Sequence, residues 1–111
     1  MELKPVRWVG RSREDVRTFP QDARRIIGKE ILRVQLGFDP TDWRPMPAVG
    51  IGAREIRVHA GNEYRVLYIA SFTEAIYVLH AFVKKTQAAP KHHIDLARQR
   101  LRLLKEARGL R

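Results

Sequence analysis

The sequence predicts a single α+β domain over residues 1–111, in which a small antiparallel sheet packs against helices. Three observations support this fold class. Three runs rich in Val, Ile, Tyr and Phe follow one another between Arg54 and Gln87, two helical patterns precede them, and a third helical pattern comes last. At 111 residues the chain has room for one core and little more. We therefore expect the order strand, two helices, loop, three strands and helix.

The first two elements are short. Residues Lys4–Val9 form a candidate strand that ends at Gly10. Ser12, with Asp15 three residues later, has the pattern of a capping box that opens a brief helix through about Thr18. We expect the strand to join the sheet and the helix to cover it.

The second helix is predicted from Gln21 to Leu36. Pro20 restarts the chain in helical geometry, and Gly37 stands where a C-cap glycine belongs. The apolar positions between them recur at helical spacing, and cationic residues lie between those positions. The expected core residues of this helix are Ala23, Ile26, Ile27, Ile31 and Val34.

The segment from Phe38 to Gly52 breaks the helical pattern. Pro40, Pro45 and Pro47, together with the glycines at its end, argue against a regular element there. We expect a loop of limited freedom.

The last helix is predicted to start at Pro90, which suits the first helical position. Its apolar stripe consists of Ile94, Ala97, Leu101 and Leu104. His92 and His93 lack the spacing of a metal site, so we interpret them as solvated residues at the helix start.

The three strand-like runs are Arg54–His59, Glu63–Phe72 and Glu74–Gln87. The connections between them are too short for the crossover that parallel strands need, so they form an antiparallel meander. The two N-terminal helices are expected on one face of this sheet. A cationic site can then lie on the other face.

Alternation along the first run assigns its side chains to two faces. Ile56 and Val58 point one way, whereas Glu55, Arg57 and His59 point the other way. In the second run, Arg65 interrupts a stretch that is apolar on both sides. A covered arginine costs free energy unless it is paired, so we expect Arg65 to face a carboxylate or an anion-binding cleft.

The charge balance favours a polyanionic partner. The chain has 22 Lys and Arg against 12 Asp and Glu, a net charge of +10. This excess is larger than solubility requires, and no long amphipathic segment has the character of a membrane-surface helix. Nucleic acid is therefore the favoured partner, ahead of a membrane.

Other features of the composition limit the class of protein. There is no cysteine, which excludes disulfides and thiolate metal sites. No apolar run is long enough to span a bilayer, and the first residues lack the apolar region of a secretory signal. We expect a cytoplasmic protein.

Several motifs resemble the phage-derived branch of the RelE/HigB toxin superfamily. They are G-x-x-Y-R-V-L-Y (Gly61–Tyr68), Y-V-L-H-A-F-V-K-K-T (Tyr77–Thr86), and R-P-M-P-A-V-G ahead of R-E-I-R-V. The resemblance covers nearly the whole chain. It implies a microbial ribonuclease fold, ribosome-dependent cleavage of mRNA, and neutralisation by a helix-turn-helix antitoxin. Because the residues show no metal-binding pattern, we expect this cleavage to need neither a metal nor a cofactor.

The resemblance also implies roles for individual residues. Arg65 matches the arginine that binds the scissile phosphate, and Arg57 matches a lysine position that steadies the substrate. Glu55 stands where the best-known members have a second lysine and other members use a glutamate as base. An alternative for Arg65 is a structural ion pair with Glu55 or Glu74.

Lys84 and Lys85 match the K-K-T strand end of the family, where a lysine can stabilise the phosphorane or protonate the leaving oxygen. His59 and His80 compete for the same role, since the ordinary histidine pKa suits acid–base catalysis. The lysines rank ahead of His80, because a single histidine on an apolar strand is often a core residue.

Two functions remain compatible with these residues. The first is an RNA-cleaving toxin whose partners are mRNA, the ribosome and the antitoxin, as a homo-oligomer or a heterotetramer with the antitoxin. The second is a noncatalytic RNA-binding or ribosome-binding module, including an inactive toxin relative. Only the first cleaves RNA.

Overall fold

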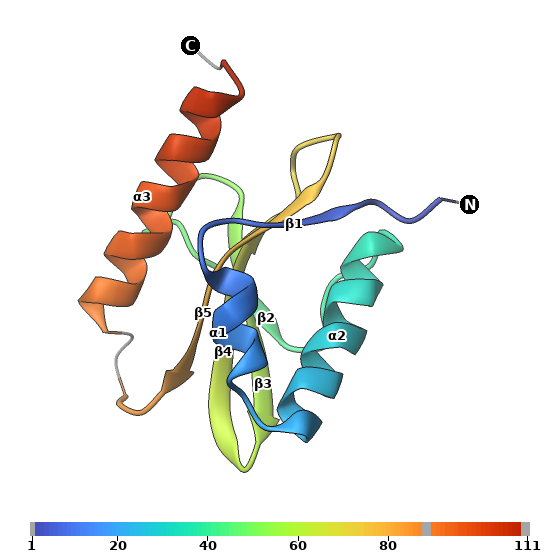
Figure 1. The fold of residues 1–111 in the computed structure, drawn as a ribbon, viewed down its shortest axis with the longest axis vertical. Helices are drawn as coiled ribbons and strands as arrows, with labels where there is room; N and C mark the ends of the chain where they lie inside the picture. The colour runs from blue at the N-terminus through green and yellow to red at the C-terminus, as the bar shows by residue number, and fades with distance from the viewer. Residues whose placement is uncertain (1, 88–89, 110–111) are drawn as a thin grey trace.

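The computed structural model describes residues 2–87 and 90–109, which form an α+β structure of five strands and three helices (Figure 1). In chain order these elements are β1 (Val6–Trp8), α1 (Ser12–Arg17), α2 (Gln21–Gln35), β2 (Trp43–Pro45), β3 (Ala53–Ala60), β4 (Asn62–Ile69), β5 (Ile76–Lys84) and α3 (Lys91–Ala107).

The predicted meander is confirmed and forms the centre of the sheet. The strand order is β1-β5-β4-β3-β2, and the pairs β3–β4 and β4–β5 are antiparallel. Gly61 alone separates β3 from β4, with a φ of 81° that favours glycine. This tight turn sets the register that places Arg57 opposite Arg65.

The sheet is mixed, so the prediction of a purely antiparallel sheet was wrong. β1 pairs in parallel with β5, and Val6 lies opposite Ile76. All elements between the two strands serve as the long crossover that parallel pairing requires. Local sequence patterns do not reveal the direction of this contact, because its two strands are far apart in the chain.

The expectation of no regular element between Phe38 and Gly52 was also wrong. β2 lies within this segment and pairs with β3, with Pro45 opposite Arg54. β2 is an edge strand. Its outer side forms no ladder, which is why a proline can be accommodated there.

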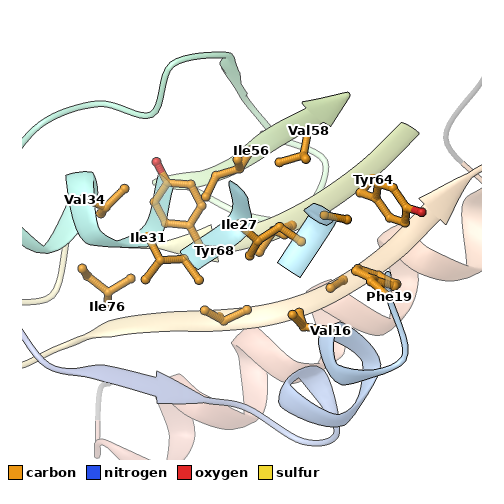
Figure 2. Close-up of a cluster of buried hydrophobic side chains, with 14 residues drawn as sticks. Val16, Phe19, Ile27, Ile31, Val34, Ile56, Val58, Tyr64, Tyr68 and Ile76 are labelled. Atoms are coloured by element: carbon orange, nitrogen blue, oxygen red, sulfur yellow. The ribbon is translucent and has the colours of Figure 1, made fainter. Parts of the chain in front are cut away.

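One core lies between the sheet and the two N-terminal helices, as predicted. Ile27 and Ile31 of α2 and Val16 of α1 pack in one cluster with Tyr64 and Tyr68 of β4 (Figure 2). Both tyrosine rings are buried.

A second core lies on the opposite face of the sheet. α3 and α2 lie on opposite sides of the strands (Figure 1). Ile94, Ala97 and Leu101 of α3 are buried against Leu67 and Leu79, which confirms these three members of the predicted stripe. The helices are too short or too polar to cross a membrane, as far as the described residues show.

The helix ends differ in detail from the predictions. Ser12 does not cap α1, because it is the first helical residue and its buried hydroxyl donates to the carbonyl oxygen of Val78 at 3.0 Å. Pro20 and Pro90 are the N-cap residues of α2 and α3, one position earlier than the first helical residue. Gly37, with a φ of 91°, ends α2 as predicted.

Candidate active site

A pocket of about 550 Å³ lies on the α3 side of the sheet, toward the end where β3 and β5 finish and β4 begins. The cross-strand register assembles it, since Arg57 pairs with Arg65 and Glu63 pairs with Lys84. The lining thus combines four cations and one carboxylate. The lining residues are Arg57, Glu63, Arg65, Lys84, Lys85, Thr86 and Gln87.

Arg65 forms the floor of this pocket. It is 3% exposed, and its Nη1 and Nη2 atoms both donate to Oε1 of Glu63 at 3.2 Å. Nη1 also donates to the carbonyl oxygen of Tyr64 at 3.0 Å. The expectation that Arg65 faces a carboxylate is therefore confirmed.

Of the two partners that the ion-pair alternative named, Glu55 forms an ion pair with Arg65 and Glu74 does not. The Nε atom of Arg65 lies 3.8 Å from Oε1 of Glu55 and has no hydrogen-bond partner among the described residues. Glu74 lies elsewhere, because it binds Arg108 through both oxygens. The closest acidic partner of Arg65 is Glu63, which sequence reasoning did not select.

Arg57 lies beside Arg65 on the neighbouring strand. It is half-buried, and its Nε atom is buried without a hydrogen-bond partner in the part of the chain that the structure describes. Two opposed guanidinium groups repel each other, and buried N–H groups cost free energy when unpaired. An anion in the pocket would relieve both.

Glu55 is not part of the pocket lining, although it lies close to Arg65. Its side chain is 1% exposed, and Oε1 accepts a hydrogen bond from Nε of Arg44 at 3.0 Å. The carboxylate is thus held between Arg44 and Arg65, which gives it a clear structural role.

Lys84 and Lys85 lie together at the mouth of the pocket. Lys84 is the last residue of β5, and Lys85 follows it at an exposed position. Both line the pocket, as their predicted role requires. The structure therefore brings together Arg57, Arg65, Lys84 and Lys85.

His80 lies apart from this group, under α3. It is 5% exposed, and its Nε2 atom lies 2.7 Å from Nδ1 of His93. Burial lowers the pKa of His80 to about 4, and the neighbouring His93 and Arg100 contribute to this shift. Phe82 is the residue two positions before Lys84, and its ring stacks on His93 with 4.1 Å between ring centroids. His80 does not line the pocket.

The interpretation of His93 as a solvated residue was wrong. It is half-buried against His80 and Phe82, while His92 is exposed as expected. The contact depends on how α3 packs on the sheet, so no local pattern predicts it. The described residues contain no group of three or more His, Cys, Asp or Glu that could hold a metal ion.

His59 and Glu63 form a hydrogen-bonded pair at the edge of the pocket. Nδ1 of His59 lies 2.7 and 2.8 Å from the two oxygens of Glu63, and Nε2 lies 2.7 Å from Oδ2 of Asp42. The hydrogen bond to Asp42 and then the one to Glu63 raise the pKa of His59. The hairpin register was the signal that could have revealed Glu63, because it places Glu63 opposite both His59 and Lys84.

A comparison with protein families adds an independent finding. The family model described as "Phage derived protein Gp49-like (DUF891)" matches residues 14–102. The chain belongs to this family. The Gp49-like family is a family of RelE-like toxins, so its membership fits a toxin of toxin–antitoxin type. An antitoxin is the partner that such a family suggests.

The matched range contains every residue that lines the pocket. No curated protein is significantly similar in sequence to this Gp49-like chain. The family and the geometry of the pocket therefore carry the functional argument.

Proposed function

We propose that this chain is the toxin of a type II toxin–antitoxin pair, of the HigB-like branch with a RelE-like fold, and that it is a metal-independent endoribonuclease. The observation that carries this proposal is the pairing of Arg57 and Arg65, with Lys84 and Lys85, around one pocket in a Gp49-like chain. Arginine forks bind phosphate through two hydrogen bonds. The strands β3 and β4 hold Arg57 and Arg65 side by side.

The proposed reaction is attack of a ribose 2′-oxygen on the adjacent phosphorus. Arg65 and Arg57 bind the scissile phosphate and stabilise the charge of the phosphorane. Lys84 or Lys85 donates a proton to the leaving 5′-oxygen. The products are a 2′,3′-cyclic phosphate and a 5′-hydroxyl, and Glu55 is the candidate that the sequence motifs name for the group that accepts the 2′-hydroxyl proton.

The proposed substrate is mRNA on the ribosome in the cytoplasm. The net charge of +10 supports a polyanionic partner, and cationic residues are also present outside the pocket on α2 and α3. The proposed antitoxin is a helix-turn-helix protein. Its complex with this chain would suppress cleavage.

The alternative is a noncatalytic module that binds RNA or the ribosome. The contact between Glu63 and Arg65 supports it, since this ion pair also has a purely structural explanation. Both functions predict RNA binding that weakens with salt. The two functions differ in their effect on the RNA, because only the ribonuclease produces fragments that end in 2′,3′-cyclic phosphate.

Induced expression in bacteria tests the proposal. We expect growth arrest, loss of intact mRNA, and fragments that end in 2′,3′-cyclic phosphate. Arg65→Ala should abolish the arrest, whereas Arg102→Ala, at an exposed site on α3, should not. Circular dichroism of both variants checks that they fold.

Unchanged growth with intact mRNA, in cells that contain the folded protein, would contradict the toxin proposal. RNA binding without cleavage would favour the noncatalytic module. Full toxicity of Arg65→Ala would contradict the assignment of the phosphate-binding residue.

A further inference from the structure

Two carboxylates lie close to the guanidinium group of Arg65, and they have different surroundings. Glu55 is 1% exposed and its Oε1 atom is already bound by Arg44. The side chain of Glu63 is 44% exposed and lines the pocket. A group that takes a proton from a bound nucleotide must reach that nucleotide. Of the two, Glu63 satisfies this condition.

We propose that Glu63 is the general base that accepts the 2′-hydroxyl proton in this pocket. The assignment rests on the proposed ribonuclease function and identifies a residue that the sequence motifs did not select. Glu63 would be a catalytic residue, because its carboxylate touches the reacting hydroxyl.

The hydrogen bonds of Glu63 place its carboxylate beside the expected position of the phosphate. Its Oε1 atom accepts from both terminal nitrogens of Arg65 at 3.2 Å. A phosphate that binds the same guanidinium group would lie next to this carboxylate. The ribose 2′-oxygen next to that phosphate is then within reach of Glu63.

The strand register places the acid and the base on neighbouring strands. Glu63 on β4 lies opposite Lys84 on β5, and directly opposed residues have Cβ atoms about 4.5–5.5 Å apart. A phosphate above Arg65 thus has a carboxylate and an ammonium group at its side. In-line cleavage requires two such groups.

Electrostatics give Glu63 the correct protonation state before the reaction. The hydrogen bond from His59, followed by that from Arg65, lowers the pKa of Glu63, so the free carboxylate is ionised at neutral pH. A phosphate that takes over Arg65 removes two of these hydrogen bonds and brings a negative charge close by. Both changes raise the proton affinity of the carboxylate at the moment of reaction.

The step is balanced without a further reactant. The 2′-hydroxyl proton moves to Glu63, the 2′-oxygen forms a bond to phosphorus, and the bond from phosphorus to the 5′-oxygen breaks. Lys84 or Lys85 gives a proton to the 5′-oxygen. His59 acts as a positioning residue, since it binds both oxygens of Glu63 and is itself held by Asp42.

The test compares purified wild-type protein with Glu63→Gln, Glu63→Asp and Glu14→Gln. Glu14 is an exposed glutamate on α1, so its variant serves as the matched control. Cleavage is measured on mRNA bound to ribosomes and on free RNA. Affinity is measured separately with 2′-O-methyl RNA, which binds but cannot react.

We expect Glu63→Gln to lower the cleavage rate by a factor of about 10² to 10⁴, the usual contribution of a general base. Its affinity for 2′-O-methyl RNA should stay equal or rise, because a negative charge leaves the pocket. Glu63→Asp should retain partial activity, and Glu14→Gln should cleave like the wild type.

Cleavage by Glu63→Gln at the wild-type rate would overturn the assignment and return the role to Glu55. Loss of 2′-O-methyl RNA binding together with cleavage would also overturn it, since Glu63 would then be only structural. A wild-type protein that binds RNA but never cleaves it would instead overturn the proposed function, and the role of Glu63 with it.

Discussion

Arg57 and Arg65 lie directly opposite each other on β3 and β4, and both line the same pocket. Like charges in such a pair reduce the stability of a sheet. Among the described residues, the acidic side chains in contact with Arg65 are Glu63 and Glu55. The two opposed arginines therefore lower the stability of the fold relative to a neutral pair, and they raise the affinity of the pocket for an anion.

Replacing each arginine should have a different effect on stability. Arg57→Ala relieves the repulsion, so the free energy of unfolding should change by no more than about 1 kcal/mol. Arg65→Ala leaves Glu55 and the Tyr64 carbonyl with fewer partners and should lower this free energy by about 2 kcal/mol or more. Urea unfolding measures both values.

The same variants should lose RNA affinity regardless of their stability. Anisotropy of labelled 2′-O-methyl RNA should show weaker binding for both, while Arg102→Ala on the exposed face of α3 should bind like the wild type. Equal affinity of Arg57→Ala and wild type would contradict the idea that the arginine pair holds a phosphate.

Salt should weaken RNA binding in proportion to the number of cations that contact phosphates. If Arg57, Arg65, Lys84 and Lys85 all take part, a plot of log affinity against log salt concentration should have a slope of about −3 for single-stranded RNA. Lys85→Ala should reduce the magnitude of this slope by about 0.7. Lys29→Ala on α2 should not change it, and a slope near zero would exclude the phosphate contacts.

Acidification should destabilise the fold through His80. Its pKa is about 4 in the folded chain and 6.5 in an exposed histidine, so the folded state disfavours protonation. Stability is therefore complete above pH 6.5 and falls between pH 6.5 and 4, by on the order of 3 kcal/mol. The charged or titratable groups that act on the ring are Asp15 at 3.6 Å, His93, Arg100 and His92.

Thermal unfolding as a function of pH measures this effect. His80→Phe should flatten the profile between pH 6.5 and 4, whereas Arg102→Ala at an exposed site on α3 should leave it unchanged. A wild-type profile that is level over this range would show that protonated His80 is accommodated in the fold.

Two glycines of the α2 region should respond to alanine in opposite directions. Gly28 lies in the middle of α2, and a Cβ added there would meet no other atom within 4 Å, so Gly28→Ala should raise the free energy of unfolding by about 0.5–1 kcal/mol. Gly37 has a φ of 91°, so Gly37→Ala should lower it by about 1 kcal/mol.

Chemical denaturation checks both glycine values, and growth arrest should persist in Gly28→Ala because α2 covers the face of the sheet opposite the pocket (Figure 1). A loss of stability in Gly28→Ala would mean that the helix surface at this position is packed more tightly than the structure shows.

The sequence by itself determined the elements whose signals are local. Alternation along β3 predicted that Arg57 and His59 share a face, and the short connection between the first two strand patterns predicted the hairpin of β3 and β4. The covered position of Arg65 also followed from its apolar neighbours. These features depend on residues that are close in the chain, where side-chain periodicity and turn length leave few alternatives.

Only the tertiary structure decided which distant residues meet. Three features depend on how separate segments pack: the parallel pairing of β1 with β5, the contact of His93 with His80, and the burial of Glu55 between Arg44 and Arg65. Sequence patterns also failed to select Glu63, although it lies in the same hairpin as Arg57 and Arg65. Its place in the pocket depends on the strand register and on its contact with the buried side chain of Arg65. The free energy of such contacts depends on burial and exact geometry, which local patterns do not encode.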